Sequence, residues 1–360
     1  MDPRYLHLLV CSAGLGLGNA TRLGAVLQKL VEEGRARGVS VRATVFAWGR
    51  AVPHFRELAG SLPLECVEIP GYRSWGGRDG SGGLREVLRL LRFFPRFARN
   101  ALRIRRWISR NRPDIVLLDS DYHLAGPRPR QMPVVFLGQA HEVIRYARSA
   151  GIRADGAGEW LSRELFERLD AWIQKRIADH VVVPCLDPAG APSSPALLRV
   201  EPVVRPAFEA DRSSGAPSHR AVVMTGGSGI GSEALMRWAE VRGIPVFSGK
   251  DSAASQADAE VLLGRMAAAE VLVVQGGLSS ISEGVALNRP MMVVPIPGHF
   301  EQKCNALQVE RLGLGMACSD PGKLGDEILE KLLLCPSPPR YSCGGAGEIA
   351  RFLLELKPEI

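Results

Sequence analysis

The sequence lacks the features of a disulfide framework, a zinc site and a membrane-spanning helix. Its seven cysteines are odd in number and have no close paired spacing. No apolar run approaches the roughly 18 residues that a bilayer-spanning helix needs, and the apolar run Tyr5–Cys11 is too short for a signal peptide. We therefore expect a cytoplasmic protein without a metal site, either free or peripheral on the inner face of the plasma membrane.

Length and composition indicate two globular domains. The 360 residues are 46% hydrophobic and 23% charged, which is typical of folded proteins with ordinary cores. Short β-branched runs alternate with segments of helical spacing, the pattern of α/β proteins with parallel sheets. A proline-rich stretch at residues 185–217 indicates a linker. We predict an α/β fold with domains at residues 1–205 and 215–343, followed by a last helix at 344–360.

The most informative stretch is a strand, a tight turn and a helix within residues 271–287. Val271–Val274 has the composition of a strand buried on both faces, and Gly276 with Gly277 allows a sharp turn that brings bare backbone close to a ligand. Three hydroxyl side chains then open the helix as N-cap and first-turn residues, namely Ser279, Ser280 and Ser282. A helix N-terminus that follows glycines is a ready site for an anion.

Further polar residues surround this stretch. Glu283 lies one turn into the helix, at the reach of a ribose. A second strand, Met291–Pro295, leads to a helix whose first turns carry Glu301, Gln302 and Asn305. Upstream, the strand Ala221–Thr225 is followed by the glycine loop 226–229.

This arrangement resembles the donor-sugar signature of GT-B nucleotide-sugar glycosyltransferases of family 28, in particular the small bacterial relatives of the peptidoglycan N-acetylglucosaminyltransferase. The resemblance implies two Rossmann-like domains that face each other across a cleft, with the last helix crossing back to the first domain. It makes Glu283 the contact to the ribose hydroxyls and places Glu301 and Gln302 on the transferred sugar. It assigns Asn305 to the turn or the phosphate. The other donor contacts that it implies are Gly227, Ser228, Gln275, Gly277, Ser279 and Ser280.

A glycine-rich loop after the first predicted strand, Leu6–Cys11, resembles the acceptor loop of the same family. The matching positions are Gly16, Gly18, Asn19 and Arg22. Many relatives carry a histidine, the proposed base, where Asn19 stands here. An amide cannot take up a proton near neutral pH, so another residue must accept the proton of the acceptor.

Acidic and histidine side chains follow the predicted strand Ile115–Leu118. Asp119 and Asp121 lie at its carboxyl end, where ligands bind in open α/β sheets. Asp121 is our first candidate for the base, because this strand should neighbour the first strand of the chain. His123 is the second candidate and His141 the third. A structural or surface role for each histidine stays open.

Arginines concentrate in one predicted helix, residues 84–112. This segment holds ten Arg and one Glu, so its charge is 10 − 1 = +9, against +7 for the whole chain. Steps of three and four place eight of these arginines on one face, and Pro95 should kink the helix or split it in two. The predicted apolar face carries Val87, Leu91, Phe94, Ala98, Ala101 and Ile108. The arginine face is either simply solvated or meets anionic lipid headgroups, and no recognised module indicates nucleic acid.

The resemblance therefore implies a metal-independent hexosyltransferase without a cofactor. Its donor would be a nucleotide diphosphate sugar, by family habit a UDP-sugar, and its unidentified acceptor could be lipid-linked. Two alternatives stay open. Asn19 favours a non-catalytic subunit that binds a sugar nucleotide for a partner. A non-hydrolysing nucleotide-sugar 2-epimerase shares the fold but needs several acid–base carboxylates, and only Asp119 and Asp121 are obvious.

Overall fold

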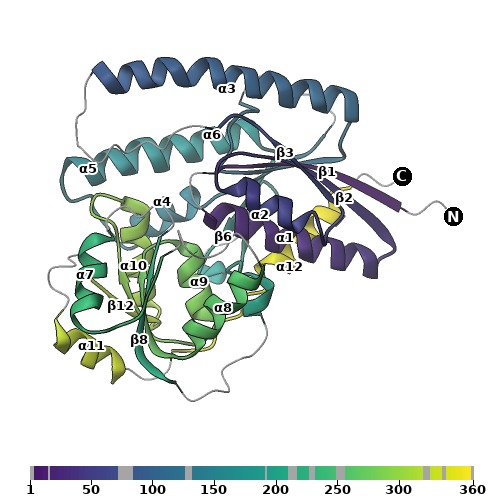
Figure 1. The fold of residues 1–360 in the computed structure, drawn as a ribbon. Coiled ribbons are helices and arrows are strands. Elements are labelled where there is room, and N and C mark those ends of the chain that lie inside the picture. Colours follow the sequence, from purple (N-terminus) through teal and green to yellow (C-terminus); the bar gives the residue numbers. More distant parts are fainter. Residues whose placement is uncertain are drawn as a thin grey trace.

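The protein consists of two parallel β-sheets, each with helices on both faces (Figure 1). The structure is a computed structural model of the 360-residue chain. It describes residues 4–14, 17–71, 84–125, 132–190, 193–209, 217–226, 232–248, 256–318, 325–334 and 338–357. Three of the predicted site residues, Gly16, Gly227 and Ser228, lie outside the described residues, as do the side chains of residues 84–93.

The first sheet has seven parallel strands in the order β3-β2-β1-β4-β5-β6-β7. Its inner strands β4 and β5 are buried along their whole length, as expected for apolar runs covered on both faces. The strands are β1 (Arg4–Ser12), β2 (Val39–Ala47), β3 (Leu64–Glu68), β4 (Ile115–Asp119), β5 (Val134–Leu137), β6 (His180–Pro184) and β7 (Leu197–Val200).

Helices from both ends of the chain cover one face of this sheet. These are α1 (Leu17–Ala36), α2 (Ala51–Leu58) and α12 (Gly345–Glu355). The buried Ile349 and Leu353 of α12 pack into the core that α1 shares with the sheet. The last helix therefore returns to the first sheet (Figure 1), and the prediction of a crossing helix is confirmed.

The other face of the first sheet carries α3 (Leu84–Asn111) and a long helical run. That run consists of α5 (Gly156–Leu161), the π-helix η1 (Ser162–Arg168) and α6 (Leu169–Ile177). It follows α4 (Ala140–Ser149).

The second sheet has five parallel strands in the order β12-β11-β10-β8-β9. They are β8 (His219–Thr225), β9 (Val246–Ser248), β10 (Ala269–Gln275), β11 (Met291–Val294) and β12 (Gly315–Ala317). One face packs against α8 (Gln256–Ala267), α9 (Leu278–Ala286) and α10 (Phe300–Arg311). The other face packs against α7 (Glu233–Val241) and α11 (Asp326–Leu333). Two parallel sheets with separate cores confirm the predicted fold class.

The predicted linker at residues 185–217 is wrong for one segment. Residues 197–200 form β7, which pairs with β6 as the edge strand of the first sheet. A four-residue strand among prolines and serines gives too short an apolar signal to be read from sequence. The exact domain boundaries stay a prediction.

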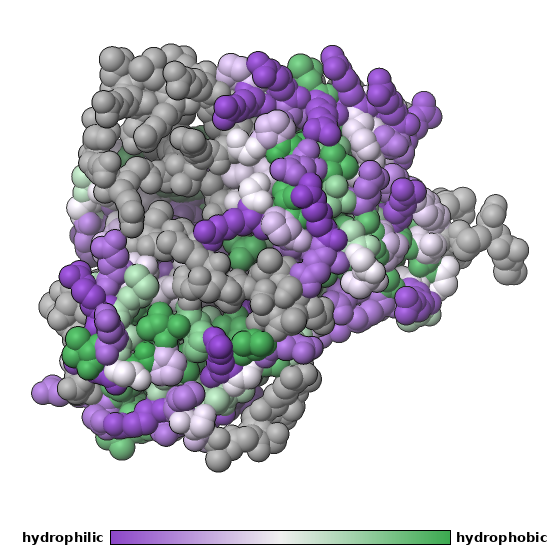
Figure 2. Space-filling view, viewed as in Figure 1, coloured by the Kyte–Doolittle hydropathy of each residue, from purple (hydrophilic) through white to green (hydrophobic). Residues whose placement is uncertain are grey.

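For α3, the predicted split at Pro95 is wrong, and the predicted apolar face is right at Ile108 but wrong at Phe94. The helix continues through Pro95 instead of splitting (Figure 1). Because Pro95 and its neighbour Arg96 are exposed, water can bind the carbonyl that the missing N–H leaves free. The buried face contains Asn100, Ile104 and Ile108, whereas Phe94 is 63% exposed. The arginines that follow Pro95 lie largely on the surface, where Figure 2 shows hydrophilic side chains standing out.

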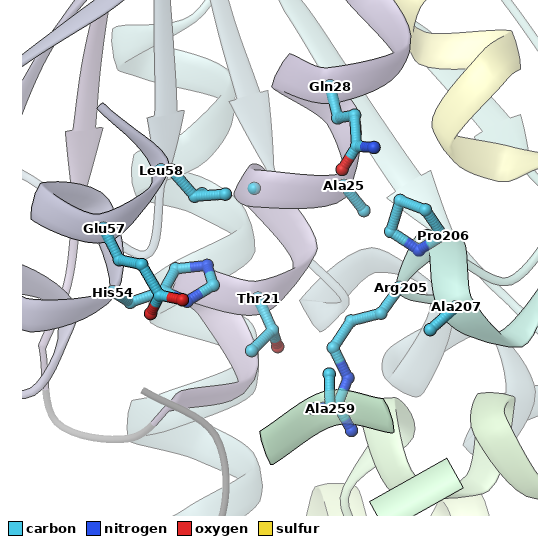
Figure 3. A pocket seen from close by; sticks show the side chains of 11 residues that line it. Thr21, Ala25, Gln28, His54, Glu57, Leu58, Arg205, Pro206, Ala207 and Ala259 are labelled. Atoms are coloured by element: carbon cyan, nitrogen blue, oxygen red, sulfur yellow. The ribbon is translucent and has the colours of Figure 1, made fainter. Parts of the chain in front are cut away.

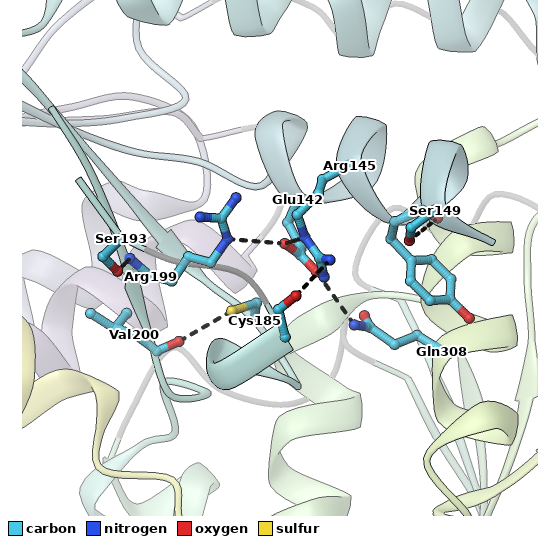
Figure 4. A network of polar contacts seen from close by, with 10 residues as sticks. Glu142, Arg145, Ser149, Cys185, Ser193, Arg199, Val200 and Gln308 are labelled. Atoms are coloured by element: carbon cyan, nitrogen blue, oxygen red, sulfur yellow. Dashed lines mark hydrogen bonds and ion pairs between the residues drawn. The ribbon is translucent and has the colours of Figure 1, made fainter.

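Side chains from the two halves meet at Glu142 of α4 (Figure 4). Its buried carboxylate accepts hydrogen bonds from Arg145 at 2.5 and 2.8 Å. It also contacts Arg199 of β7 at 3.5 Å and Gln308 of α10 at 3.4 Å. This network ties α10 of the second half to α4 and β7 of the first.

Candidate active site

The turn between β10 and α9 forms the core of the candidate donor site. Gly277 is the N-cap of α9 in extended conformation (φ −73°, ψ 131°), so the prediction of a serine N-cap is wrong. Ser279 and Ser280 are half-buried first-turn residues, whereas Ser282 is buried within the helix. A Cβ added at Gly277 would have open space around it. The N-terminus of α9 therefore presents free backbone N–H groups beside open space, as an anion site requires.

Gly276 is required for a different reason, which is close packing. A Cβ at this position would lie 2.7 Å from the Cβ of Gln302 and 2.8 Å from its carbonyl oxygen. The Asn305 side chain also donates a hydrogen bond to the Gly276 carbonyl at 2.9 Å. The first turns of α10 therefore hold the β10–α9 turn in place, as predicted for Asn305.

Two glutamines fix the neighbouring loops through backbone contacts. The buried Gln275 side chain accepts a hydrogen bond from the backbone N–H of Gly226, so it joins the carboxyl ends of β8 and β10. The Gln302 side chain accepts one from Ile296 N–H at 2.9 Å and thereby shapes the loop after β11. Direct contacts of Gln275 with a phosphate and of Gln302 with a sugar stay predictions.

Glu283, the predicted ribose contact, forms a nearly buried ion pair. Its Oε1 accepts a hydrogen bond from Nε of Arg205 at 2.7 Å, and the side chains are only 7% and 11% exposed. The Nη1 atom of Arg205 is buried and has no hydrogen-bond partner among the described residues. Arg205 also lines a cavity of about 40 Å³ (Figure 3), together with Thr21, Gln28, His54 and Glu57.

The candidate acceptor loop faces the donor turn directly. A Cβ at Gly18, in the first turn of α1, would lie 3.0 Å from the Oγ atom of Ser279. The N-termini of α1 and α9 therefore approach each other from the two halves. The structure thus brings together the two glycine motifs that the sequence separates by some 260 residues.

Arg22 and Asp119 form a second buried ion pair on the acceptor side. Nε and Nη2 of Arg22 donate to the two Asp119 oxygens at 2.9 and 2.6 Å. Nη2 also donates to Oδ1 of Asn19 at 3.3 Å. Burial raises the pKa of the Asp119 carboxyl, and the Arg22 guanidinium opposes this rise. Asn19 is thus held by the same guanidinium that joins α1 to β4.

The two predicted catalytic residues, Asp121 and His123, are buried against each other. Both Asp121 oxygens lie 2.8 Å from Nδ1 of His123. The His123 ring stacks on Phe97 of α3 with centroids 4.8 Å apart, and its Nε2 faces the Asn100 amide at 3.4 Å. Asp121 therefore orients His123, and the pair lies under α3. A role of either residue as the base stays a prediction.

The sequence reading missed two further carboxylates, Glu167 and Asp170. They lie at the junction of η1 and α6, where Asp170 accepts a hydrogen bond from the Tyr122 hydroxyl at 2.6 Å. The charge of Glu301 acts on Glu167, Asp170 and Arg22 alike. Glu301 at the start of α10 is therefore near enough to these three residues for its charge to act on them. The sequence could have revealed them, because two acidic side chains three positions apart lie on one side of an amphipathic helical segment.

His141, the third candidate for the base, is partly buried on α4. Burial lowers the pKa of His141 to about 4, and the nearby charges of Lys175 and Arg199 act in the same direction. Its Nε2 has no hydrogen-bond partner within the described ranges. The ring is therefore neutral near pH 7.

Among the described residues, no group of three or more His, Cys, Asp or Glu side chains could hold a metal ion. Within the same part of the chain, every helix is too short or too polar to cross a bilayer.

Solved structures match the whole of this architecture at low sequence identity. The glycotransferase of kitacinnamycin has a TM-score of 0.61 at 17% identity, covering 99% of this chain and 100% of its own. MurG from Acinetobacter baumannii has a TM-score of 0.57 at 15% identity, covering 97% and 99%. The calicheamicin glycosyltransferase CalG4 has a TM-score of 0.55 at 15% identity, covering 99% and 96%. The chain has the GT-B fold.

Sequence comparisons relate part of this GT-B chain to glycosyltransferases. A family model described as Glycosyl transferase family 1 matches residues 255–334, which contain β10, α9, β11 and α10. Two similar curated proteins are UDP-N-acetylglucosamine--N-acetylmuramyl-(pentapeptide) pyrophosphoryl-undecaprenol N-acetylglucosamine transferases. The protein from Methylobacterium radiotolerans is 32% identical over 77 residues, and that from Methylorubrum populi is 32% identical over 96 residues.

These sequence matches are short. They cover 21% of each chain for the Methylobacterium protein and 26% of each chain for the Methylorubrum protein. The predicted relation to GT-B glycosyltransferases of the MurG type is confirmed by the fold and by the matched segment. The segment matched by the family model contains the residues predicted to hold the donor from Gln275 to Asn305.

Proposed function

We propose that this protein transfers a sugar from a nucleotide diphosphate donor to an acceptor hydroxyl. The observation that carries the proposal is the approach of Gly18 to Ser279, which sets an acceptor loop against an anion-binding helix N-terminus. In such a reaction the N-terminus of α9 stabilises the leaving diphosphate, because its N–H groups and dipole favour negative charge. The acceptor approaches from the α1 side.

The donor is a UDP-sugar in this proposal, with N-acetylglucosamine as the first sugar to test. Support comes from the curated relatives, whose names state UDP-N-acetylglucosamine as donor. A thymidine diphosphate is the competing nucleotide, because the glycosyltransferase SsfS6, with a TM-score of 0.51, was solved with that ligand. Glu283 binds the ribose hydroxyls, while Glu301 and Gln302 contact the sugar.

The acceptor is lipid-linked and reached at an anionic membrane surface. Apolar side chains on α5, η1 and α6 support this, since five of them are 44–54% exposed, namely Trp160, Leu161, Phe166, Leu169 and Trp172. They lie on the same face of the first sheet as α3, whose arginines Arg96, Arg99, Arg106 and Arg110 are exposed. Exposed apolar and cationic side chains on helices that cover the same face of a sheet suit a surface of anionic lipid.

Transfer to a lipid tests the proposal directly. The protein is incubated with radiolabelled UDP-N-acetylglucosamine and a bacterial lipid extract, and label is counted in the organic phase. We expect label to enter the lipid fraction and UDP to be released. If the protein binds the donor but no label moves to lipid or to a panel of soluble acceptors, the alternative of a non-catalytic binding subunit holds.

Vesicle sedimentation tests the membrane surface separately. The protein should pellet with vesicles that contain acidic phospholipid, remain soluble with neutral vesicles and be released by salt. Replacing Arg96, Arg99, Arg106 and Arg110 with Gln should abolish sedimentation without unfolding. Binding that is independent of lipid charge would instead favour a merely solvated arginine face.

A further inference from the structure

Three polar side chains share one face of the helical run formed by η1 and α6. Glu167, Asp170 and Gln174 follow each other at steps of three and four, so they share one side of the helix. Asp170 accepts a hydrogen bond of 2.6 Å from the hydroxyl of Tyr122, which lies in the loop after β4. The Phe300 N–H at the start of α10 donates to Ser162 Oγ at 3.2 Å. The group therefore lies between the carboxyl end of β4 and the N-terminus of α10.

Within the described residues, three carboxyl groups gather in this region without an ion pair to a basic side chain. Glu167, Asp170 and Glu301 are three carboxyl groups close enough for their charges to act on one another. The charge of Glu301 also acts on the Arg22 guanidinium, but both Asp119 oxygens already bind that group. A proton or a substrate hydroxyl group is the natural partner for such a cluster.

A buried carboxyl group without a partner gives a second sign of a ligand. Glu167 is 5% exposed, and among the described residues only burial and the charges of Glu301 and Asp170 act on its carboxyl group. Gln174 is fully buried, and its side chain interacts with Asp170, whose pKa this contact lowers. Buried polar groups are normally paired. The π-helical turn that carries Glu167 is also a type of distortion frequent at functional sites.

We propose that Asp170 is the general base of the transfer reaction, with Tyr122 orienting its carboxylate and Glu167 beside it. This inference rests on the proposed function. The acceptor O–H bond breaks and its proton passes to Asp170. The acceptor oxygen forms a bond to the anomeric carbon of the sugar, and the bond from that carbon to the diphosphate oxygen breaks. The nucleotide diphosphate leaves with the electron pair and is stabilised at the N-terminus of α9.

The protonation state of Asp170 suits the role of a general base. Burial raises the pKa of Asp170 to about 6, the Tyr122 hydrogen bond opposes the rise, and the Glu301 carboxylate adds to it. Burial also raises the pKa of Glu167 well above its usual range, with Glu301 and Asp170 acting in the same direction. At neutral pH Asp170 is thus largely charged. A base whose pKa lies near the working pH is the efficient one.

Two carboxylate variants and a control on the neighbouring π-helix η1 test the assignment. Release of UDP from UDP-N-acetylglucosamine is followed with the bacterial lipid extract, and donor Kd is measured by calorimetry. Asp170→Asn should lower kcat at least a hundredfold with donor Kd unchanged. Asp121→Asn should lower it far less. Glu164→Gln, which removes a carboxylate paired with Arg163 and Arg168, should leave both quantities unchanged.

A readout without turnover separates a base from a structural carboxyl group. Carbon-13 carboxyl spectra should show a group that titrates near pH 6 and is missing in Asp170→Asn. Because the raised pKa disfavours the charged form, Asp170→Asn should also raise Tm at pH 7.5 and leave it unchanged at pH 4. Full kcat in Asp170→Asn would overturn the assignment while leaving sugar transfer intact. If the wild-type protein releases no UDP, the proposed function itself fails.

Discussion

The donor half and the acceptor half of the cleft are built from different kinds of contact. On the donor side, the polar side chains of Gln275, Gln302 and Asn305 bind backbone atoms of neighbouring loops. On the acceptor side, side chains bind one another, as in the pairs Arg22–Asp119, Asp121–His123 and Tyr122–Asp170. The donor side is therefore shaped mainly by the backbone, and the acceptor side by ionisable groups whose protonation can change.

The ion pair between Glu283 and Arg205 is the donor-side exception, and breaking it should have the largest effect. Glu283→Ala leaves the Arg205 guanidinium buried without its partner, so we expect a loss of about 3–5 kcal/mol in the free energy of unfolding. Denaturant titration measures this loss. The exposed Glu310→Ala on α10 is the matched control and should change stability by less than about 0.5 kcal/mol. A loss below about 1 kcal/mol in Glu283→Ala would show that the pair is solvated.

Adjacent glycines separate packing from ligand access on the donor side. Gly276→Ala forces a Cβ against Gln302 and should cost about 1–3 kcal/mol of stability, measured by denaturant titration. Gly277→Ala has open space and an ordinary φ, so stability should hold while affinity for nucleotide diphosphate falls. Equal stability in the two variants would contradict the packing of α10 on the turn.

Acid should affect turnover much more than donor binding. Asp170 must lose its proton to act as a base, and its pKa is about 6. We therefore expect turnover to fall about tenfold from pH 8 to pH 5, as the carboxylate becomes protonated. Donor Kd from calorimetry should change by less than about threefold over the same range. Parallel losses of turnover and donor affinity would remove the distinction between the two halves.

The smallest expected effect concerns stability in acid on the acceptor side. The pKa of His141 is lowered from 6.5 to about 4. Between these two pH values the imidazole is protonated in the unfolded chain but neutral in the folded protein. This contribution is present above pH 6.5 and is lost as the pH falls from 6.5 to 4. Tm should therefore decrease less across this window in His141→Gln than in the wild-type protein. An identical decrease of Tm in the variant and the wild-type protein would show that His141 is exposed to solvent.

The difference between the halves also decides what could be predicted from sequence. The donor turn, from Gln275 to Asn305, is one continuous stretch, so its spacing carries most of its geometry. The acceptor side joins α1, the end of β4 and the π-helix η1, which are separated by up to about 150 residues. The strand pattern predicted that Asp119 and Asp121 lie at a strand end. The contact between Asp170 and Tyr122 depends on tertiary packing and could not be predicted from sequence.

Errors in the predicted elements have local physical causes. Helix α3 continues through Pro95 because solvent can bind the freed carbonyl, and its buried face is set by tertiary packing of Ile104 and Ile108. Strand β7 lies in a proline-rich stretch that has no clear strand pattern, and it is stabilised by pairing with the edge of β6. The alternation of strands and helices could be predicted elsewhere, since most buried strands are short apolar runs followed by a turn.

Binding of a nucleotide diphosphate at the N-terminus of α9 is the most direct test of the donor site. Calorimetric titrations of the wild-type protein, Gly277→Ala and Glu301→Ala would use UDP, thymidine diphosphate and UDP-N-acetylglucosamine. We predict that UDP and the sugar nucleotide bind, that Gly277→Ala weakens both, and that Glu301→Ala weakens only the sugar nucleotide. A wild-type protein that binds none of the three ligands would contradict the proposed donor site.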